Sequence, residues 1–515
     1  MTAHVLAVDL GSTGIKVAVV DDVAKVRAVA GEVIPLIFLD GGGVEQDPRV
    51  WWDALGRCAR RAVADSGLRP TDIGIVAVTS QYTSTTAVDA TGHPLGNTVM
   101  WMDERGSRHY RPNFTAEQTD RWIEVHGAVP YGNGDVGHVH VIRHEWPDAY
   151  AAASALVEPM DLLAARLTGH VTATQNTMFP MLSVDNRTWG LTEYSDELLI
   201  MSGMPADKLP PLVPLGQPRG TVTSEAAGHL DVSPSAVVTG ATIDSVTSAI
   251  GTGAISDDCC GLIIGTTAVM ATHLPSKRHD IEHGLTTAPS PLPHQWFLVA
   301  ENGIGGKALD VFVNQFVYPD DGLGHAVHDG AYSAVLDAAA SAPCGSNGVL
   351  FLPWLVGSMA PGKSRHVRGG FVNFGLTSTR ADMARAVLEG VAMNVAWLLP
   401  YFSALAGRTY EQITFGGGGA ASSLWGQVLS DATGLPVRRL AQPSCTNAHG
   451  AALLALYETG ALSMADLSKF LVTAELHEPR DADHRILVAR THSLIDFHTR
   501  NVPFFETFDS KGHTP

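Results

Sequence analysis

Short apolar runs alternate with longer amphipathic segments along the chain. In the first third, residues 5–10, 15–20 and 73–80 are nearly continuous apolar runs, while residues 48–66 and 159–168 repeat apolar positions at helical spacing. Strands that alternate with helices in this way are typical of α/β proteins with mainly parallel sheets. We therefore expect strands and helices in turn through most of the chain.

The sequence contains one weak internal repeat. The stretches "DLGSTGIK" and "IIGTTAVM" share an apolar strand, a glycine, two consecutive hydroxyl residues and a second strand. Repeats of this kind indicate duplicated structural units, and 515 residues exceed what one hydrophobic core usually holds. We predict two related α/β domains, residues 1–252 and 253–515, that face each other across a cleft.

Composition narrows the classes of partner. The net charge is −18, with 34 basic against 52 acidic residues, which argues against a nucleic-acid partner and against an anionic membrane surface. No stretch approaches the roughly 18 apolar residues of a membrane span, and no basic leader precedes an apolar run. The five cysteines are scattered without zinc spacing. We expect reduced, buried thiols in a cytoplasmic protein.

A carboxylate ends the first apolar run. Asp9 stands directly before a turn that contains Ser12 and Thr13. A tight hairpin accounts for the flanking glycines but not for the carboxylate. Because the chain has no G-x-x-x-x-G-K-[ST] motif, any phosphates would be held by hairpin amides, hydroxyls and a divalent ion. Asp9 would then lie near magnesium, through water; the alternative is an incidental surface aspartate.

A glycine-rich run follows a predicted strand at residues 413–416. Gly416, Gly418 and Ala421 fit the G-x-G-x-x-A dinucleotide fingerprint, but Arg438 and Arg439 stand where an acidic ribose ligand is expected. We therefore favour a mononucleotide base or ribose site. A tight packing turn is the structural alternative, and an NAD-dependent oxidoreductase is the alternative function.

Two polar groups follow other predicted strands. Asp244 begins a helix; it is either an ordinary N-cap or, if it faces the cleft, a general base kept ionised by the helix dipole. Gln81, Tyr82 and Thr83 stand at a strand's C-terminal end, where open α/β sheets bind ligands. Asp103 closes this segment and is a further sugar-binding candidate, although it could equally form a local ion pair with the nearby Arg105.

The motifs, taken in order, resemble the FGGY carbohydrate kinases over about residues 6–455. They are "LAVDLGSTGIKVAVVD", "GATIDSVTSAIGTG", "GTTAVM", "DMARAVLEGVAMNV", "FGGGGAASSLWGQVLSDATGLPV" and "NAHGAALLA". The resemblance implies two ribonuclease-H-like (actin/hexokinase-type) domains, ATP and Mg²⁺ in the cleft, and transfer of the γ-phosphate to a sugar or polyol hydroxyl. Such an enzyme needs a small-molecule sugar or polyol as partner, and the sequence allows but does not require a homodimer.

The resemblance also implies roles for single residues. Asp244 matches the catalytic base and Asp9 the metal-linked acid. At the sugar site, glycerol kinases carry Arg-Glu and xylulokinases Met-His where this chain has Tyr82 and Thr83. Taken over the whole chain, the sequence resembles the xylulokinase-like branch more closely, so a pentulose such as xylulose is expected as substrate. A catalytically silent binding protein is a further alternative. The nucleotide-site positions are Thr13, Lys16, Gly265, Thr266, Thr267, Gly306, Gly418, Gly419 and Ser422.

Overall fold

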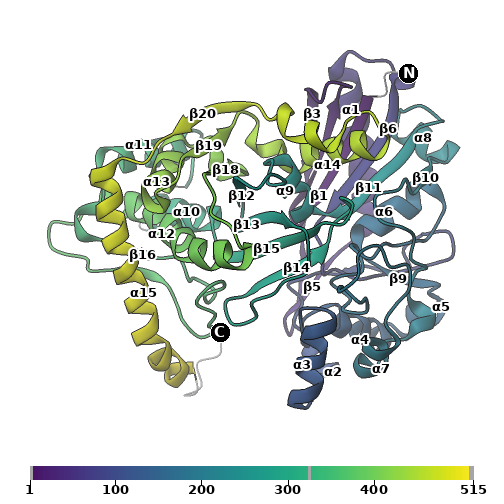
Figure 1. Ribbon diagram of the computed structural model, residues 1–515, viewed down its shortest axis with the longest axis horizontal. Helices are drawn as coiled ribbons and strands as arrows, with labels where there is room; N and C mark the ends of the chain where they lie inside the picture. Colours follow the sequence, from purple (N-terminus) through teal and green to yellow (C-terminus); the bar gives the residue numbers. More distant parts are fainter. Residues whose placement is uncertain (1–3, 323–325, 510–515) are drawn as a thin grey trace.

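The computed structural model describes residues 4–322 and 326–509, and two large sheets organise it (Figure 1). The strands of the first sheet, in spatial order, are β10 (Gly220–Thr221), β11 (Val237–Ile243), β6 (Ile73–Ser80), β1 (His4–Gly11), β2 (Gly14–Val20) and β3 (Val26–Val33). Those of the second are β14 (Leu285–Pro289), β15 (Trp296–Ile304), β13 (Thr267–Leu274), β12 (Cys259–Ile264), β18 (Gln412–Gly416), β19 (Val437–Leu440) and β20 (Thr473–His477).

The two sheets repeat one arrangement. In the first, β1 pairs antiparallel with β2 across the turn and parallel with β6 on its other side. In the second, β12 pairs antiparallel with β13 and parallel with β18. The predicted α/β architecture and the two predicted hairpins are therefore confirmed.

Helices cover the sheets, and short strand pairs complete the fold. The helices are α1 (Pro48–Ser66), α2 (Gly106–His109), α3 (Ala116–Val125), α4 (Asp135–Glu145), α5 (Pro147–Ala152), α6 (Pro159–Thr168), α7 (Asp196–Ser202), α8 (Ser224–Leu230), α9 (Asp244–Gly251), α10 (Gly306–Val311), α11 (Ala331–Ser341), α12 (Arg380–Ala406), α13 (Ser423–Thr433), α14 (Thr446–Glu458) and α15 (Asp481–Asp509). The short strands are β4 (Ile37–Leu39), β5 (Gly43–Gln46), β7 (Thr86–Val88), β8 (Thr98–Val99), β9 (Ala155–Val157), β16 (Leu350–Leu352) and β17 (Gly370–Val372).

One hydrophobic core packs against the first sheet and another against the second, and we name them the first core and the second core. Helix α12 forms much of the second core. It is 27 residues long, and of the described helices it alone has the length and hydropathy of a membrane span. However, 72% of its most apolar window is buried inside the protein. Its apolar surface is therefore accounted for by packing within the second core.

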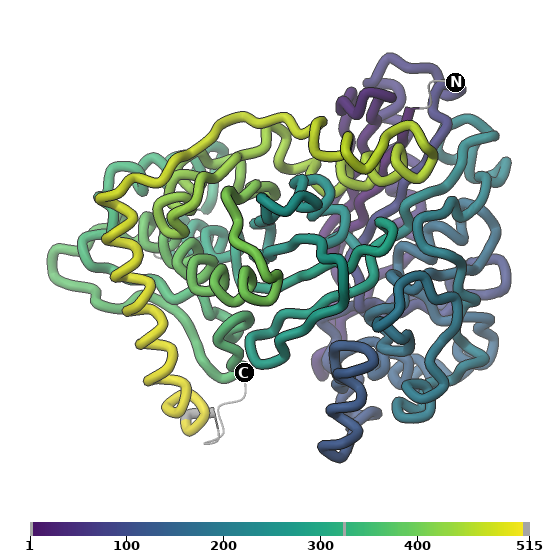
Figure 2. The backbone as a smooth tube through the Cα atoms, viewed as in Figure 1, coloured from purple at the N-terminus to yellow at the C-terminus, as the bar shows by residue number. Residues whose placement is uncertain are grey.

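Helix α14 lies in sequence between β19 and β20 of the second sheet but packs into the first core. Figures 1 and 2 show the chain passing from the second sheet to α14, which lies beside the strands of the first. Leu453 and Leu454 are fully buried in the same core as β1 and β6. Where α14 crosses α9, a Cβ on Gly450 would lie 1.9 Å from the carbonyl oxygen of Thr247. The two helices therefore cross in close contact, and the division at 252/253 stays a prediction.

A third core lies within the first half of the chain. It surrounds the fully buried Trp122 and includes apolar side chains from residues 173–209. The sequence predicts residues 178–218 as an elaborated connection, and most of that segment is irregular apart from α7. Its methionine and leucine side chains give this connection a packed interior of its own.

The cysteines form no disulfide. All five are free, as predicted, and four of them are buried. Cys344 is only half-buried, so the expectation of burial is wrong at that position. Its neighbours are the C-terminal end of α11 and the start of α15, where the second core meets solvent.

Candidate active site

Asp9 lies near the end of β1, and its side chain is only 8% exposed. Lys16 is its partner across the β1–β2 ladder, and the Asn447 side chain of α14 lies beside it. Burial raises the pKa of Asp9, while Lys16 and Asn447 partly offset this effect. Ser248 of α9 donates to Asn447 Oδ1 at 2.6 Å. Asn447 therefore links the β1 carboxylate to the helix that carries Asp244.

Asp244 is the first residue of α9, immediately after β11. Burial raises its pKa to about 7, and the Asp9 carboxylate adds to this rise. The helix dipole favours the ionised form, as expected, but desolvation and a like charge act against the dipole here. A pKa near 7 is nevertheless well suited to a general base at neutral pH.

The polar residues after β6 face Asp244 and the second domain. Ser12 and Ser84 both donate to Gln81 Oε1, at 3.4 and 3.3 Å. The Tyr82 hydroxyl donates to Glu301 Oε1 of β15 at 3.4 Å. Burial raises the pKa of Tyr82 well above its usual value, and the Glu301 and Asp244 carboxylates raise it further. These side chains from both halves of the chain therefore form one polar group, which we name the Tyr82–Glu301 group.

Two aromatic residues that were not predicted from the sequence border the Tyr82–Glu301 group. The Trp101 indole donates to Ser12 Oγ at 2.9 Å and is 39% exposed. Tyr131 is 58% exposed; desolvation, the Asp135 carboxylate and then the Glu301 carboxylate raise the pKa of its hydroxyl. Trp101 lies in the same sequence segment as Gln81, so it could have been predicted as a residue of this site. Tyr131 lies in an irregular stretch, and no sequence pattern there indicates its position.

Asp103 lies outside this group. Its side chain is fully buried and accepts hydrogen bonds from the Val44 amide and from the Arg105 guanidinium, which also pairs with Glu45. Both carboxylate oxygens are occupied by the protein itself. The structure therefore contradicts a sugar-binding role for Asp103 and supports the local ion pair instead.

The glycine-rich segments meet around the end of β12. The Gly306 amide donates to Gly265 O at 2.8 Å, and a Cβ on Gly419 would lie 2.9 Å from the Ile264 side chain. In contrast, a Cβ on Gly265 or Gly418 would meet nothing within 4 Å. This backbone is therefore packed on one side and open on the other. The predicted positions that it brings together are Gly265, Thr266, Thr267, Gly306, Gly418 and Gly419.

The other predicted nucleotide residues differ in their surroundings. Ser422 is buried, and its hydroxyl accepts from the Trp425 amide as the N-cap of α13. Thr13 is exposed in the β1–β2 turn. Lys16 Nζ donates to the carbonyl oxygen of Ser444 at 3.0 Å, which joins the first hairpin to the second domain.

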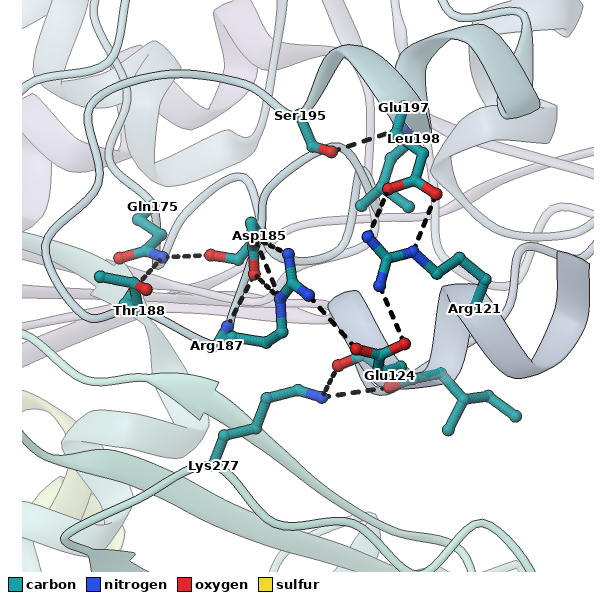
Figure 3. A network of polar contacts seen from close by, with 11 residues as sticks. Arg121, Glu124, Gln175, Asp185, Arg187, Thr188, Ser195, Glu197, Leu198 and Lys277 are labelled. Atoms are coloured by element: carbon teal, nitrogen blue, oxygen red, sulfur yellow. Dashed lines mark hydrogen bonds and ion pairs between the residues drawn. The ribbon is translucent and has the colours of Figure 1, made fainter.

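A further contact between the halves lies at α3 (Figure 3). Lys277, which follows β13, donates to the carbonyl oxygens of Ile123 and Glu124 at 3.1 and 2.7 Å. A cation at the C-terminal end of a helix is favourable because the last carbonyls carry partial negative charge. The third core is therefore tied to the second domain through a helix end.

Known protein families match both halves of the chain. Residues 4–251 match the N-terminal domain of the FGGY family of carbohydrate kinases, and residues 260–459 match its C-terminal domain. The chain belongs to the FGGY family of carbohydrate kinases. As a member it is an ATP-dependent sugar kinase, and the oxidoreductase interpretation of the glycine-rich run is set aside.

Relatives across the FGGY family cover almost all of the chain. A xylulose kinase from Staphylococcus epidermidis is 26% identical over 486 residues, 93% of each protein. An autoinducer-2 kinase from Klebsiella pneumoniae is 26% identical over 85% of this chain and 82% of the relative. The structure of a gluconate kinase from Lactobacillus acidophilus superposes with a TM-score of 0.83 at 19% identity, covering 99% of this chain and all of that one. The gluconate kinase structure shares the fold of this chain, and the substrates named for these three relatives differ.

Proposed function

We propose that this FGGY kinase phosphorylates a pentulose such as xylulose, with Asp244 as the general base. The observation that carries the proposal is the position of Asp244: a carboxylate with a pKa raised to about 7, at a helix start, in electrostatic contact with Tyr82 and Glu301. In the reaction, Asp244 takes the proton of the sugar hydroxyl as its oxygen bonds to the γ-phosphorus. The bond between this phosphorus and the β,γ-bridging oxygen breaks, and ADP leaves.

The nucleotide is assigned to the glycine-rich backbone around β12. The open sides of Gly265 and Gly418 leave room for phosphates and for the base or ribose, and Thr13 and Lys16 approach from the first hairpin. Among the described residues no three His, Cys, Asp or Glu side chains gather as a metal site. Asp9 and Asp244 nevertheless fit magnesium, which usually keeps water and phosphate oxygens and takes one or two carboxylates. When bound, the ion neutralises charge on the phosphates, and Asp9 would hold it through water.

The sugar is assigned to the first domain, at Gln81, Tyr82 and Thr83, with Trp101 and Tyr131 added. Hydroxyl and amide groups beside aromatic faces suit a polyhydroxy ligand. The choice of a pentulose as substrate is based on the relatives, because the proteins from Staphylococcus epidermidis, Bacillus subtilis and Escherichia coli are named xylulose kinases. We infer a cytoplasmic enzyme, since ATP is available there and the thiols are free; a homodimer stays a prediction.

The test is an ADP-release assay with Mg-ATP over pentuloses, hexuloses, polyols and aldonates. We expect the highest kcat/KM with a pentulose, and loss of that activity in Asp244→Asn. Higher kcat/KM with glycerol or a hexulose would contradict the substrate but keep the reaction. No ATP-dependent turnover with any neutral sugar, in protein with a native melting transition, would contradict the proposed function.

A further inference from the structure

We propose that Glu301 is a substrate-binding residue that reaches the sugar from the second domain and makes the site select neutral sugars over sugar acids. The proposal deepens the proposed function and rests on the Tyr82–Glu301 group being the sugar site. It assigns part of substrate specificity to the domain that otherwise holds the nucleotide.

The position of Glu301 arises from an irregularity in β15. Ala268 of β13 pairs with Gly303 and the next residue, Val269, pairs with Glu301, so that Asn302 is left without a partner in the ladder. Gly303 has φ +95°, which favours glycine. A bulge of this kind bends the strand and redirects side chains, and bulges are common beside active sites. Here Glu301 is exposed, while its neighbours on either side along the strand are buried.

The second core holds this bulge in place. Asn302 is 2% exposed; its amide donates to the carbonyl oxygens of Ala360 and Asn394 at 2.9 and 3.1 Å. Asn394 of α12 returns a hydrogen bond to Asn302 O at 2.7 Å, and the Ala360 amide donates to Glu301 O at 3.0 Å. The backbone that carries Glu301 is therefore fixed on both sides. A backbone fixed in this way preorganises the point from which the Glu301 side chain reaches the site.

The carboxylate of Glu301 has only one long hydrogen bond. Its Oε1 accepts from Tyr82 at 3.4 Å, and within residues 4–322 and 326–509 no donor contacts its Oε2. Its charge also raises the pKa of Asp244 and of Tyr131, which places it close to the proposed base and to the aromatic border. Oε2 is thus an unused acceptor that adjoins the site where a hydroxyl is to be deprotonated.

The charges of the group indicate the class of substrate. A carboxylate can accept from two neighbouring hydroxyls at once, and hydrogen bonds to a charged group are stronger than neutral ones. Asp9, Asp244 and Glu301 are all acidic, whereas the other residues assigned to the sugar are neutral. An anionic sugar would add a further negative charge beside these acidic groups. A neutral ketose or polyol is therefore favoured over an aldonate of the same length.

The test compares Glu301→Gln with the wild type on the best neutral sugar and on the aldonate of equal carbon number. Glutamine keeps the shape but removes the charge and one acceptor. We expect KM for the neutral sugar to rise about tenfold, kcat to fall less than about threefold and KM for ATP to stay unchanged. The ratio of kcat/KM between neutral sugar and aldonate should fall about tenfold or more. Glu282→Gln, at an exposed turn before β14, is the matched charge control.

Tyr82→Phe separates the two roles that Glu301 could have. If Glu301 only holds Tyr82, both variants give the same kinetics and an unchanged neutral-to-acid ratio, which would overturn the proposal. A change of less than twofold in both KM and the ratio in Glu301→Gln would overturn it as well. Wild-type preference for a hexulose would contradict the pentulose but leave Glu301 in place, so the two failures are distinguishable.

Discussion

Replacing Asp244 by asparagine should abolish activity and, at alkaline pH, increase stability. The pKa of Asp244 rises from 3.8 to about 7 in the folded protein, so the folded state keeps a proton that the unfolded chain releases. The resulting cost to stability is absent below pH 3.8, grows as pH rises, and is complete above about pH 7. At 1.36 kcal/mol per pKa unit, this cost to the free energy of unfolding is at most about 4 kcal/mol. Because the side chain is partly exposed, solvent screening reduces it to about 1–2 kcal/mol.

Asparagine removes this cost because it cannot ionise. At pH 8 we expect Asp244→Asn to melt about 2–4 °C higher than the wild type, and at pH 5 the gain should be less than half as large. At the same time kcat should fall by about 10²-fold or more, and wild-type kcat/KM should decline below about pH 7 as the base becomes protonated.

The assay is differential scanning fluorimetry in EDTA without nucleotide, with initial rates measured on the same preparations. An equal melting difference at pH 5 and pH 8 would refute the claim that burial raises the pKa of Asp244. Retained kcat on the preferred sugar would remove Asp244 from the role of base, whatever its effect on melting.

Three further predictions concern the nucleotide, the sugar and the helix crossing. Mg-ATP at 100 times its Kd should stabilise the protein by about 2.7 kcal/mol in thermal-shift measurements, more than ATP with EDTA; a shift with NAD alone would contradict the nucleotide site. Thr83→Val, which keeps the branched side chain at φ +58°, should lower kcat/KM for the sugar and alter the ranking of sugars; a raised KM for ATP instead would place Thr83 at the nucleotide. Gly450→Ala should destabilise by about 1–3 kcal/mol and lower kcat, because its Cβ would lie 1.9 Å from Thr247 O in the helix that carries Asp244. Gly228→Ala, with open space around its Cβ, is the matched control and should gain about 0.5–1 kcal/mol; equal melting temperatures for the two variants would refute the close crossing.

The local structure could be predicted because each signal is contained in a few neighbouring residues. The two hairpins follow from apolar runs around Gly–hydroxyl turns, and α1 and α6 end where Gly67 and Gly169 take φ values of +71° and +77°. The strand, turn and helix of the glycine-rich run followed from the same kind of pattern. Ser422, given there as a nucleotide residue, is the N-cap of α13.

What could not be predicted depends on long-range partners. The apolar pattern of α14 indicates that the helix is buried, but not that it is buried in the first core. Asp103 and Arg105 carry the same charges whether they bind a sugar or each other. For Asp244 the helix dipole is visible in sequence, whereas the opposing desolvation and the nearness of Asp9 arise only on folding. Glu301 is a single acid in a strand, and the bulge that turns it has no sequence signature.

The packing of α14 in the first core affects the order in which the protein folds during synthesis. The strands β1, β6 and β11 are complete by residue 243, but their buried face includes Ala451, Leu453 and Leu454. Roughly 200 residues must be translated between the end of α9 and the end of α14, which takes about 10–40 s at the usual rates of elongation. Throughout that interval the nascent first domain exposes apolar surface. A ribosome-bound chain that is stalled before residue 446 should therefore remain protease-sensitive and bind chaperones. Once α14 has emerged from the ribosome, protease sensitivity and chaperone binding should be lost together in a single step.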